Sequence, residues 1–101
     1  YTDFDADSDQ YKWLEADLAK VNRTTTPWIF ALLHAPWYNS NEAHQGEGES
    51  MRKAMEELLY KARVDAVFAG HVHAYERFVR SKSLPHFISI HESYYYIISI
   101  Y

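Results

Sequence analysis

The sequence predicts an α/β fold built around a strand–helix–strand unit. Two short apolar runs are separated by a segment in which apolar side chains recur at helical spacing, and a histidine or a glycine stops each run. This order is typical of two parallel strands joined by a right-handed crossover helix. The chain has 101 residues, of which 48% are hydrophobic and 24% charged, so it suits one small globular domain or part of a larger one.

A first helix is expected over about residues 8–21. Asp7 and Gln10 have the spacing of a capping box, and acidic residues suit the positive end of the helix dipole. Apolar side chains then recur at helical spacing and form one stripe: Tyr11, Leu14, Leu18 and Val21.

The strand–helix–strand unit follows this helix. The run 28–33 is short and does not alternate with polar residues, which indicates a strand buried on both faces. After a polar loop, a second helix is expected over about 49–63. A second strand follows over about 65–69 and stops at Gly70. The inner face of the second helix is lined by apolar side chains: Met51, Met55, Leu58, Leu59 and Ala62.

The last part of the chain, 81–101, differs in composition from the rest. It mixes Ser, Ile, Tyr and His and contains no Gly and no Asp. Its β-prone segments, 88–90 and 94–101, are typical of a strand or two. The alternative, which we favour, is an atypical tail that packs poorly and lies outside the fold of residues 1–80.

Charge and composition exclude several classes of protein. The net charge is −4, so the chain lacks the basic footprint that a nucleic-acid binder needs. Without cysteine it can form no disulfide, thiolate metal site or cysteine nucleophile. No apolar run reaches the roughly 18 residues of a membrane span, and the acidic first ten residues lack the pattern of a signal peptide. We therefore expect no nucleic-acid partner and no membrane association.

Three histidines follow the ends of the two predicted parallel strands. His34 ends the first strand, and Gly70-His71-Val72-His73 follows the second. Because the carboxyl ends of parallel strands meet at one edge of a sheet, we expect these imidazoles to lie together on loops. Histidine is the commonest metal ligand near neutral pH, so the placement favours metal binding, with satisfied surface or core histidines as the alternative.

A fourth histidine, His44, lies in the polar loop after the first strand, among Glu42, Glu47 and Glu49. A histidine on this edge suits a general acid or a phosphate contact, although spacing alone favours a solvated loop residue. The glutamates are explained by a helix N-terminus lined with acids. Two aromatic residues of the same loop are expected to line a cleft: Trp37 and Tyr38.

The segments around these histidines resemble the plant purple acid phosphatases, which belong to the calcineurin-like metallophosphoesterase superfamily. The resemblance is carried by QYKWLEADL, LLHAPWYNS, HQGEGESMR and above all GHVHAYERF. The GHxH element is typical of the whole superfamily, and its combination with the other motifs is a strong match to the plant enzymes. The resemblance covers about 1–78 and implies that residues 1–80 form the C-terminal half of a metallophosphoesterase catalytic domain, a partial sandwich.

The resemblance also implies an acid phosphatase that hydrolyses phosphate monoesters at a dinuclear metal centre, Fe(III) paired with Zn, Mn or Fe. Carried over by motif, His34 and His71 ligate the divalent metal and His73 ligates the iron. His44 matches an active-site histidine that contacts phosphate and protonates the leaving group. Two cations about 3.5 Å apart clamp the phosphate, neutralise its charge and supply a hydroxide.

Membership of this family further implies a secreted, cell-wall or vacuolar glycoprotein, which fits the N-x-T sequon at Asn22. The family's other metal ligands belong to an upstream half, and no GD or GNH sequence occurs here. Three imidazoles can hold one divalent ion but offer no bridging carboxylate. We therefore expect the chain alone to be an inactive part of such an enzyme. The alternative is a non-catalytic fragment that binds at most one divalent metal or a partner chain.

Overall fold

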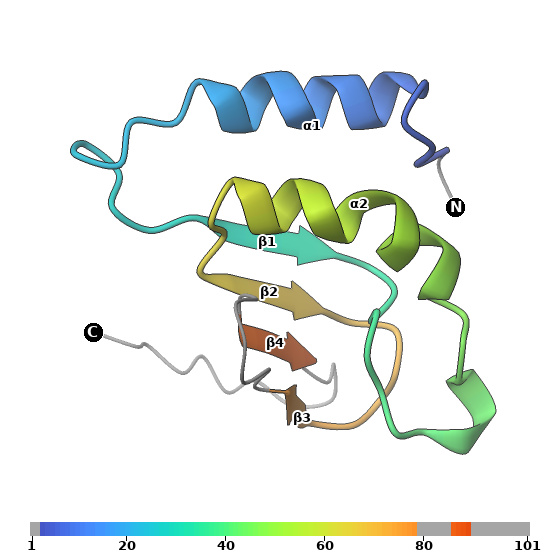
Figure 1. The fold of residues 1–101 in the computed structure, drawn as a ribbon. Helices are drawn as coiled ribbons and strands as arrows, with labels where there is room; N and C mark the ends of the chain where they lie inside the picture. Colours follow the sequence, from blue (N-terminus) through green and yellow to red (C-terminus); the bar gives the residue numbers. More distant parts are fainter. Residues whose placement is uncertain (1–2, 79–85, 90–101) are drawn as a thin grey trace.

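The computed structural model describes residues 3–78 and 86–89. Within these residues, two α-helices, one 3-10 helix and four strands follow one another along the chain (Figure 1). The predicted α/β class and the predicted order of its first four elements are confirmed. The elements are α1 (Asp9–Ala19), β1 (Phe30–Leu33), η1 (Glu42–His44), α2 (Glu49–Lys61), β2 (Ala66–Ala69), β3 (Glu76–Phe78) and β4 (His86–Ser89).

The four strands form one sheet in the order β1-β2-β4-β3. β1 pairs in parallel with β2, from Phe30 opposite Ala66 to Leu33 opposite Ala69. β2 pairs in parallel with β4, and β3 runs antiparallel to β4. The unit β1–α2–β2 is therefore the predicted strand–helix–strand crossover, and it places the carboxyl ends of β1 and β2 at the same edge.

α1 is capped by Ser8 and not by Asp7. The Ser8 hydroxyl oxygen accepts a hydrogen bond from the Tyr11 amide over 3.1 Å, which satisfies one of the amides left unpaired at a helix start. The predicted apolar stripe is partly buried, and Tyr11, Leu14 and Leu18 pack against the core. The expected packing of one side of this helix is confirmed.

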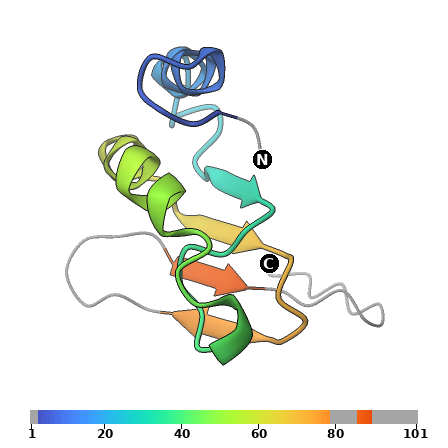
Figure 2. The same cartoon turned by 90° about the vertical axis from the view of Figure 1, so that its right-hand side faces the viewer.

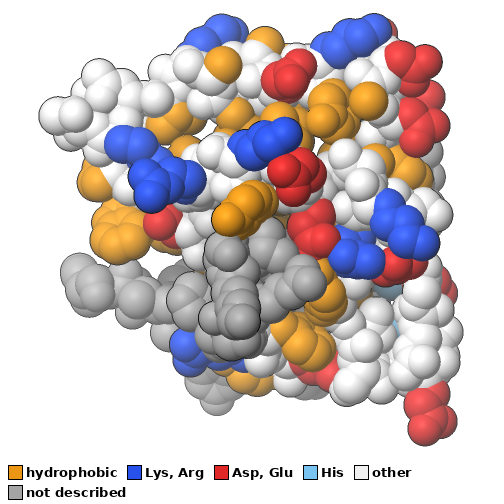
Figure 3. Space-filling view, viewed as in Figure 1, with side chains coloured by type: hydrophobic (Ala, Val, Ile, Leu, Met, Phe, Trp, Pro, Cys, Tyr) orange, Lys and Arg blue, Asp and Glu red, His pale blue; other side chains and the backbone are white. Residues whose placement is uncertain are grey.

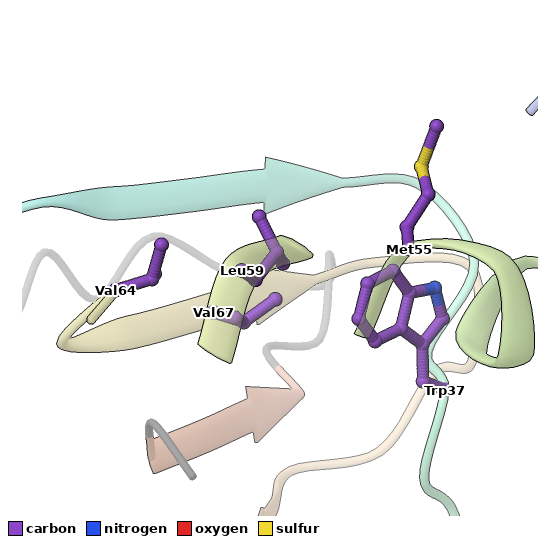
Figure 4. Packing of buried hydrophobic residues seen from close by; sticks show 5 residues of the cluster. All are labelled: Trp37, Met55, Leu59, Val64 and Val67. Carbon is purple, nitrogen blue, oxygen red and sulfur yellow. The ribbon is translucent and has the colours of Figure 1, made fainter. Parts of the chain in front are cut away.

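The core lies between α2 and one face of the sheet (Figures 2 and 4). Its buried cluster is formed by the loop after β1, the inner face of α2 and the start of β2: Trp37, Met55, Leu59, Val64 and Val67. The expectation that Trp37 lines a cleft is wrong, because its side chain is only 5% exposed and packs in this cluster. Its neighbour Tyr38 is partly buried and donates its hydroxyl hydrogen bond to the Glu56 carboxylate of α2.

The expectation that β1 is buried on both faces is also wrong. Along β1 the side chains alternate between exposed and partly buried, and Leu32 is 82% exposed. β1 is an edge strand; α2 covers one face of the sheet and α1 lies beyond β1, so within the described residues no α-helix covers the other face (Figure 2). Phe30 and Phe68 meet edge to face on that open face, with their ring centroids 5.9 Å apart.

The expectation of a poorly packed tail beyond residue 80 needs correction at one segment. Residues 86–89 form β4, which lies between β2 and β3 and pairs with both. The β-propensity of this stretch therefore predicted its structure better than its unusual composition did. The boundary between a family fold of 1–80 and a separate tail of 81–101 stays a prediction, because 79–85 and 90–101 lie outside the described residues.

Charged side chains of both signs are interspersed over the helical face of the molecule (Figure 3). None of the helices in the described part of the chain has the length and apolar character needed to cross a membrane.

Candidate metal centre

The candidate site is formed by the loops that follow β1 and β2 at the carboxyl edge of the sheet (Figure 1). His34 comes directly after β1, and His71 comes two residues after the end of β2. The Gly70 amide donates to the His34 carbonyl over 3.1 Å, so the two strands stay joined as far as the first residues of both loops. The predicted meeting of these loops at one edge is confirmed.

The rings of His34 and His71 are in direct contact. His34 Nε2 lies 3.1 Å from His71 Nδ1, and the ring centroids are 4.9 Å apart. One of the two nitrogens must carry the proton and the other must accept it, so the tautomers of the two rings are linked. The expected proximity of His34 and His71 is confirmed, whereas their ligation of a shared metal stays a prediction.

The backbone at His71 adopts a conformation that ordinary residues avoid. Its φ is 67°, in the left-handed region, which raises the conformational energy of a residue with a side chain by about 1–2 kcal/mol. The neighbouring Val72 is 1% exposed, and its amide donates to the Gly70 carbonyl over 2.8 Å. The burial of Val72 thus stabilises the turn from which the His71 ring contacts His34 and Glu47. Strained backbone of this kind is typical of functional sites.

The loop after β1 carries His44 and is pinned at several points. Asn39 donates from its side-chain amide to the His44 carbonyl over 3.3 Å, and Asn41 caps η1. The Ser40 amide donates to both carboxylate oxygens of Glu76, over 3.1 and 3.0 Å, which ties the loop to β3. His44 is therefore presented from a loop that is fixed to the sheet.

Two glycines let this loop return toward the sheet. Gly46 has a φ of 81°, which glycine adopts without strain. At Gly48, a Cβ would lie 2.3 Å from the Pro36 carbonyl oxygen, so only glycine fits where α2 begins. The backbone between these glycines carries Glu47, and their geometry places it beside the histidines.

Glu47 links two of the histidines. Its Oε2 lies 2.8 Å from His71 Nε2 and 3.1 Å from His44 Nδ1, and the centroids of the His44 and His71 rings are 4.9 Å apart. Hydrogen bonds from His71 and then from His44 lower the pKa of the Glu47 carboxyl. The sequence interpretation assigned the glutamates of this loop to a helix N-terminus and missed this role. The signal that could have found it is Gly46, which turns the chain between His44 and Glu47.

The donor atoms of this group suit a divalent metal ion. One ligand atom from each of His44, Glu47 and His71 can be chosen so that all three lie within 4.8 Å of one another. Imidazole nitrogens with a carboxylate oxygen are a common ligand set for zinc and related ions. This group shares only His71 with the ligands predicted from the sequence, which are His34, His71 and His73.

His73 is not part of this close group. Its side chain is exposed, and the group of metal-competent side chains found among the described residues contains His71 but not His73. The structure brings His34, His44 and His71 together through the ring contacts of His71. The assignment of His73 to an iron ion stays a prediction.

Asn22 lies away from this edge, in the turn that follows α1. Its side chain is exposed, and its Oδ1 accepts a hydrogen bond from the Thr24 amide over 3.0 Å. Glycosylation of this asparagine stays a prediction.

Histidines from the loops that follow β1 and β2 thus meet at one edge of the sheet. Residues 1–75 match the family model described as calcineurin-like phosphoesterase. The chain belongs to that family, and plant purple acid phosphatases are among its sequence relatives.

Among the relatives, purple acid phosphatase 22 of Arabidopsis thaliana is 78% identical over 80 residues, which are 79% of this chain and 18% of the relative. A phosphoenolpyruvate phosphatase of Allium cepa is 51% identical over 89 residues, 88% of this chain and 18% of the relative. The structure of a purple acid phosphatase from yellow lupin (Lupinus luteus) seeds matches with a TM-score of 0.74 and 29% identity, covering 86% of this chain and 19% of that one. The chain therefore spans about a fifth of the length of these proteins.

Proposed function

We propose that this chain is part of an acid phosphatase that hydrolyses phosphate monoesters at a dinuclear metal centre. The observation that carries the proposal is the meeting of His34, His44 and His71 at the carboxyl edge of β1 and β2, in a chain of the phosphoesterase family. In this proposal His34 and His71 hold a divalent ion of Zn, Mn or Fe, and His73 holds Fe(III).

When both ions are bound, they neutralise the charge of the phosphate and supply a hydroxide for attack in line with the leaving group. The residues of this chain orient the substrate and move a proton. His44 is carried by a pinned loop beside the metal-binding rings, where its protonated imidazole donates to a phosphate oxygen or to the oxygen of the leaving alcohol.

The chain alone offers an incomplete ligand set for this chemistry. Its sequence has no GD or GNH motif to supply the bridging carboxylate and the tyrosine that the resemblance implies. We therefore infer that the isolated chain does not turn over substrate. The alternative function is a non-catalytic chain that binds at most one divalent metal or a partner chain, and the contacts of Glu47 with two histidines favour a single metal site. By resemblance we also propose a secreted, cell-wall or vacuolar location and a glycan on the exposed Asn22.

The test is a chimera in which residues 1–78 replace the matching stretch of the Arabidopsis relative that is 78% identical. We expect the chimera to hydrolyse a generic phosphate monoester at acid pH, and the isolated chain to show no turnover. In the chimera, His71→Ala should abolish turnover together with metal content. His44→Ala should keep the metals and slow turnover by roughly 10²–10⁴-fold, which is the usual effect of a general acid. An inactive but folded chimera, or an unaffected His71→Ala variant, would contradict the proposal.

A further inference from the structure

We propose that the chain on its own binds one divalent ion of the zinc type through His44 Nδ1, the Glu47 carboxylate and His71 Nε2. This site differs from the group His34, His71 and His73 that the family resemblance implies. The alternative function given above is a non-catalytic chain with one metal site, and these three residues would be the ligands of that site. The inference does not depend on phosphatase activity.

The distances between the ligand atoms carry the inference. Around a tetrahedral zinc ion, with bonds of about 2.0–2.1 Å, neighbouring ligand atoms lie about 3.3–3.4 Å apart. Glu47 Oε2 lies 2.8 Å from His71 Nε2 and 3.1 Å from His44 Nδ1. These separations need to open by only a few tenths of an ångström to admit the ion. Glu47 is exposed, so rotation of its side chain can provide this, and the ligand atoms of His44 and His71 lie within 4.8 Å of each other.

The charges and proton positions also suit a cation. Glu47 is the single carboxylate of the group, and two neutral imidazoles complete a set with a net charge of −1. The second ring nitrogen of His71 lies 3.1 Å from His34 Nε2. When the proton is on His71 Nδ1, it is donated to His34 and leaves Nε2 free for the metal. Ligating histidines usually have such a partner, which fixes their tautomer. His34 is thus a positioning residue in this site.

The ligand types select among the possible ions. Two nitrogens and one oxygen favour Zn²⁺, Co²⁺ or Ni²⁺ over Mg²⁺ and Ca²⁺, which prefer ligand sets made of oxygen. The side chains of Glu47, His44 and His71 are partly open to solvent, so water can complete the coordination and the ion can enter without unfolding.

The experiment is a calorimetric titration of the metal-free chain with Zn²⁺ at pH 7.5. We expect one ion per chain, and Glu47→Gln should weaken binding by at least about tenfold, since it removes a ligand and its charge. Glu42→Gln is the matched control: it removes an exposed carboxylate from the same loop, outside the group, and should leave the affinity unchanged. Circular dichroism checks that each variant folds, and Zn²⁺ should raise the melting temperature of the unaltered chain more than that of Glu47→Gln.

Equal Zn²⁺ affinity of the Glu47→Gln and unaltered chains would overturn the inference, as would a chain that binds no Zn²⁺. A larger loss in His73→Ala than in Glu47→Gln would also overturn it, because the ion would then lie on the histidines that the resemblance implies. Any of these results would leave the phosphatase proposal standing, since that proposal is tested by turnover in the chimera.

The positioning role of His34 has its own test. His34→Ala should weaken Zn²⁺ binding by about 10–100-fold, whereas His34→Gln should largely restore it, because a glutamine oxygen can accept the proton of His71 Nδ1. Equal losses in the two variants would show instead that His34 itself ligates the ion.

Discussion

At the scale of single residues, one carboxylate sets the geometry on which the site depends. Asp65 precedes β2, and its Oδ2 accepts hydrogen bonds from the Ile29 amide over 2.8 Å and from Arg23 Nη1 over 2.6 Å. The Asp65 amide in turn donates to the Ile29 carbonyl over 2.9 Å. These bonds join the starts of β1 and β2 in a fixed register. The same register continues to Leu33 opposite Ala69, directly before the loops that carry His34 and His71.

We predict that Asp65→Asn lowers the free energy of unfolding by about 1 kcal/mol at pH 7, as expected for a charged acceptor that is one-third exposed. Burial opposes ionisation of Asp65, but the Arg23 guanidinium and the Ile29 amide outweigh it and lower the pKa of the carboxyl. A lowered folded-state pKa stabilises the fold above the unfolded pKa of about 3.9, and this contribution is lost as pH falls through the folded value. The difference between the two chains should therefore shrink in acid.

Urea unfolding at pH 7 and at pH 3 checks this prediction. Asp17→Asn is the control, because it removes an exposed carboxylate from α1 and should change stability by less than about 0.5 kcal/mol. If Asp65→Asn lowers the free energy of unfolding by as much at pH 3 as at pH 7, the ionised carboxylate is not what stabilises the contact between the starts of β1 and β2.

Residue-level reasoning from the sequence found part of the site. His34 and His71 could be placed together because each follows a parallel strand, and such strands end at one sheet edge. Glu47 could not, because its contacts depend on a loop that turns at Gly46 and is pinned to β3 through Glu76. Gly46 marks a turn in this loop, but loops carry no periodic pattern that shows which side chains such a turn brings together.

At the scale of elements, periodicity identified the helices and strands well but could not tell which faces are covered. The run that forms β1 is apolar at every position, a pattern typical of a strand that is covered on both sides. The described chain covers one side only, so Leu33 is partly buried while Phe30 and Leu32 remain exposed. Trp37 was misassigned for a related reason, since its burial depends on how the loop after β1 folds back onto α2.

One face of the sheet is covered by α2 and the other is exposed at β1, and this difference gives a prediction about stability. Leu32→Ser should change the free energy of unfolding by less than about 0.5 kcal/mol, because Leu32 is 82% exposed. Leu59→Ala on α2 should cost about 2–5 kcal/mol, because Leu59 is 3% exposed and its removal leaves a cavity in the core. Denaturant unfolding of both variants provides the measurement. Comparable losses would mean that the open face of β1 is covered in solution.

At the scale of the whole molecule, the sheet depends on a strand from the end of the described chain. β4 lies between β2 and β3, and β3 has no other strand partner within the described residues. The loop from β2 to β3 carries His71 and ends at Glu76, which holds the loop of His44 through Ser40. The sheet edge that carries the candidate metal site is therefore linked to β4 through β3.

We predict that a chain ending after residue 89 is more stable than one ending after residue 78. The shorter chain lacks β4, so it exposes the backbone edge of β2 and leaves β3 unpaired, and each lost backbone hydrogen bond costs about 0.5–1.5 kcal/mol. We expect the free energy of unfolding to fall by at least about 2 kcal/mol, a large share of the 5–15 kcal/mol that is usual for a domain. Both chains lack 90–101, so the comparison isolates the segment that contains β4. Urea unfolding at the same midpoint in both chains would support the original expectation that the residues beyond about 80 do not belong to the fold.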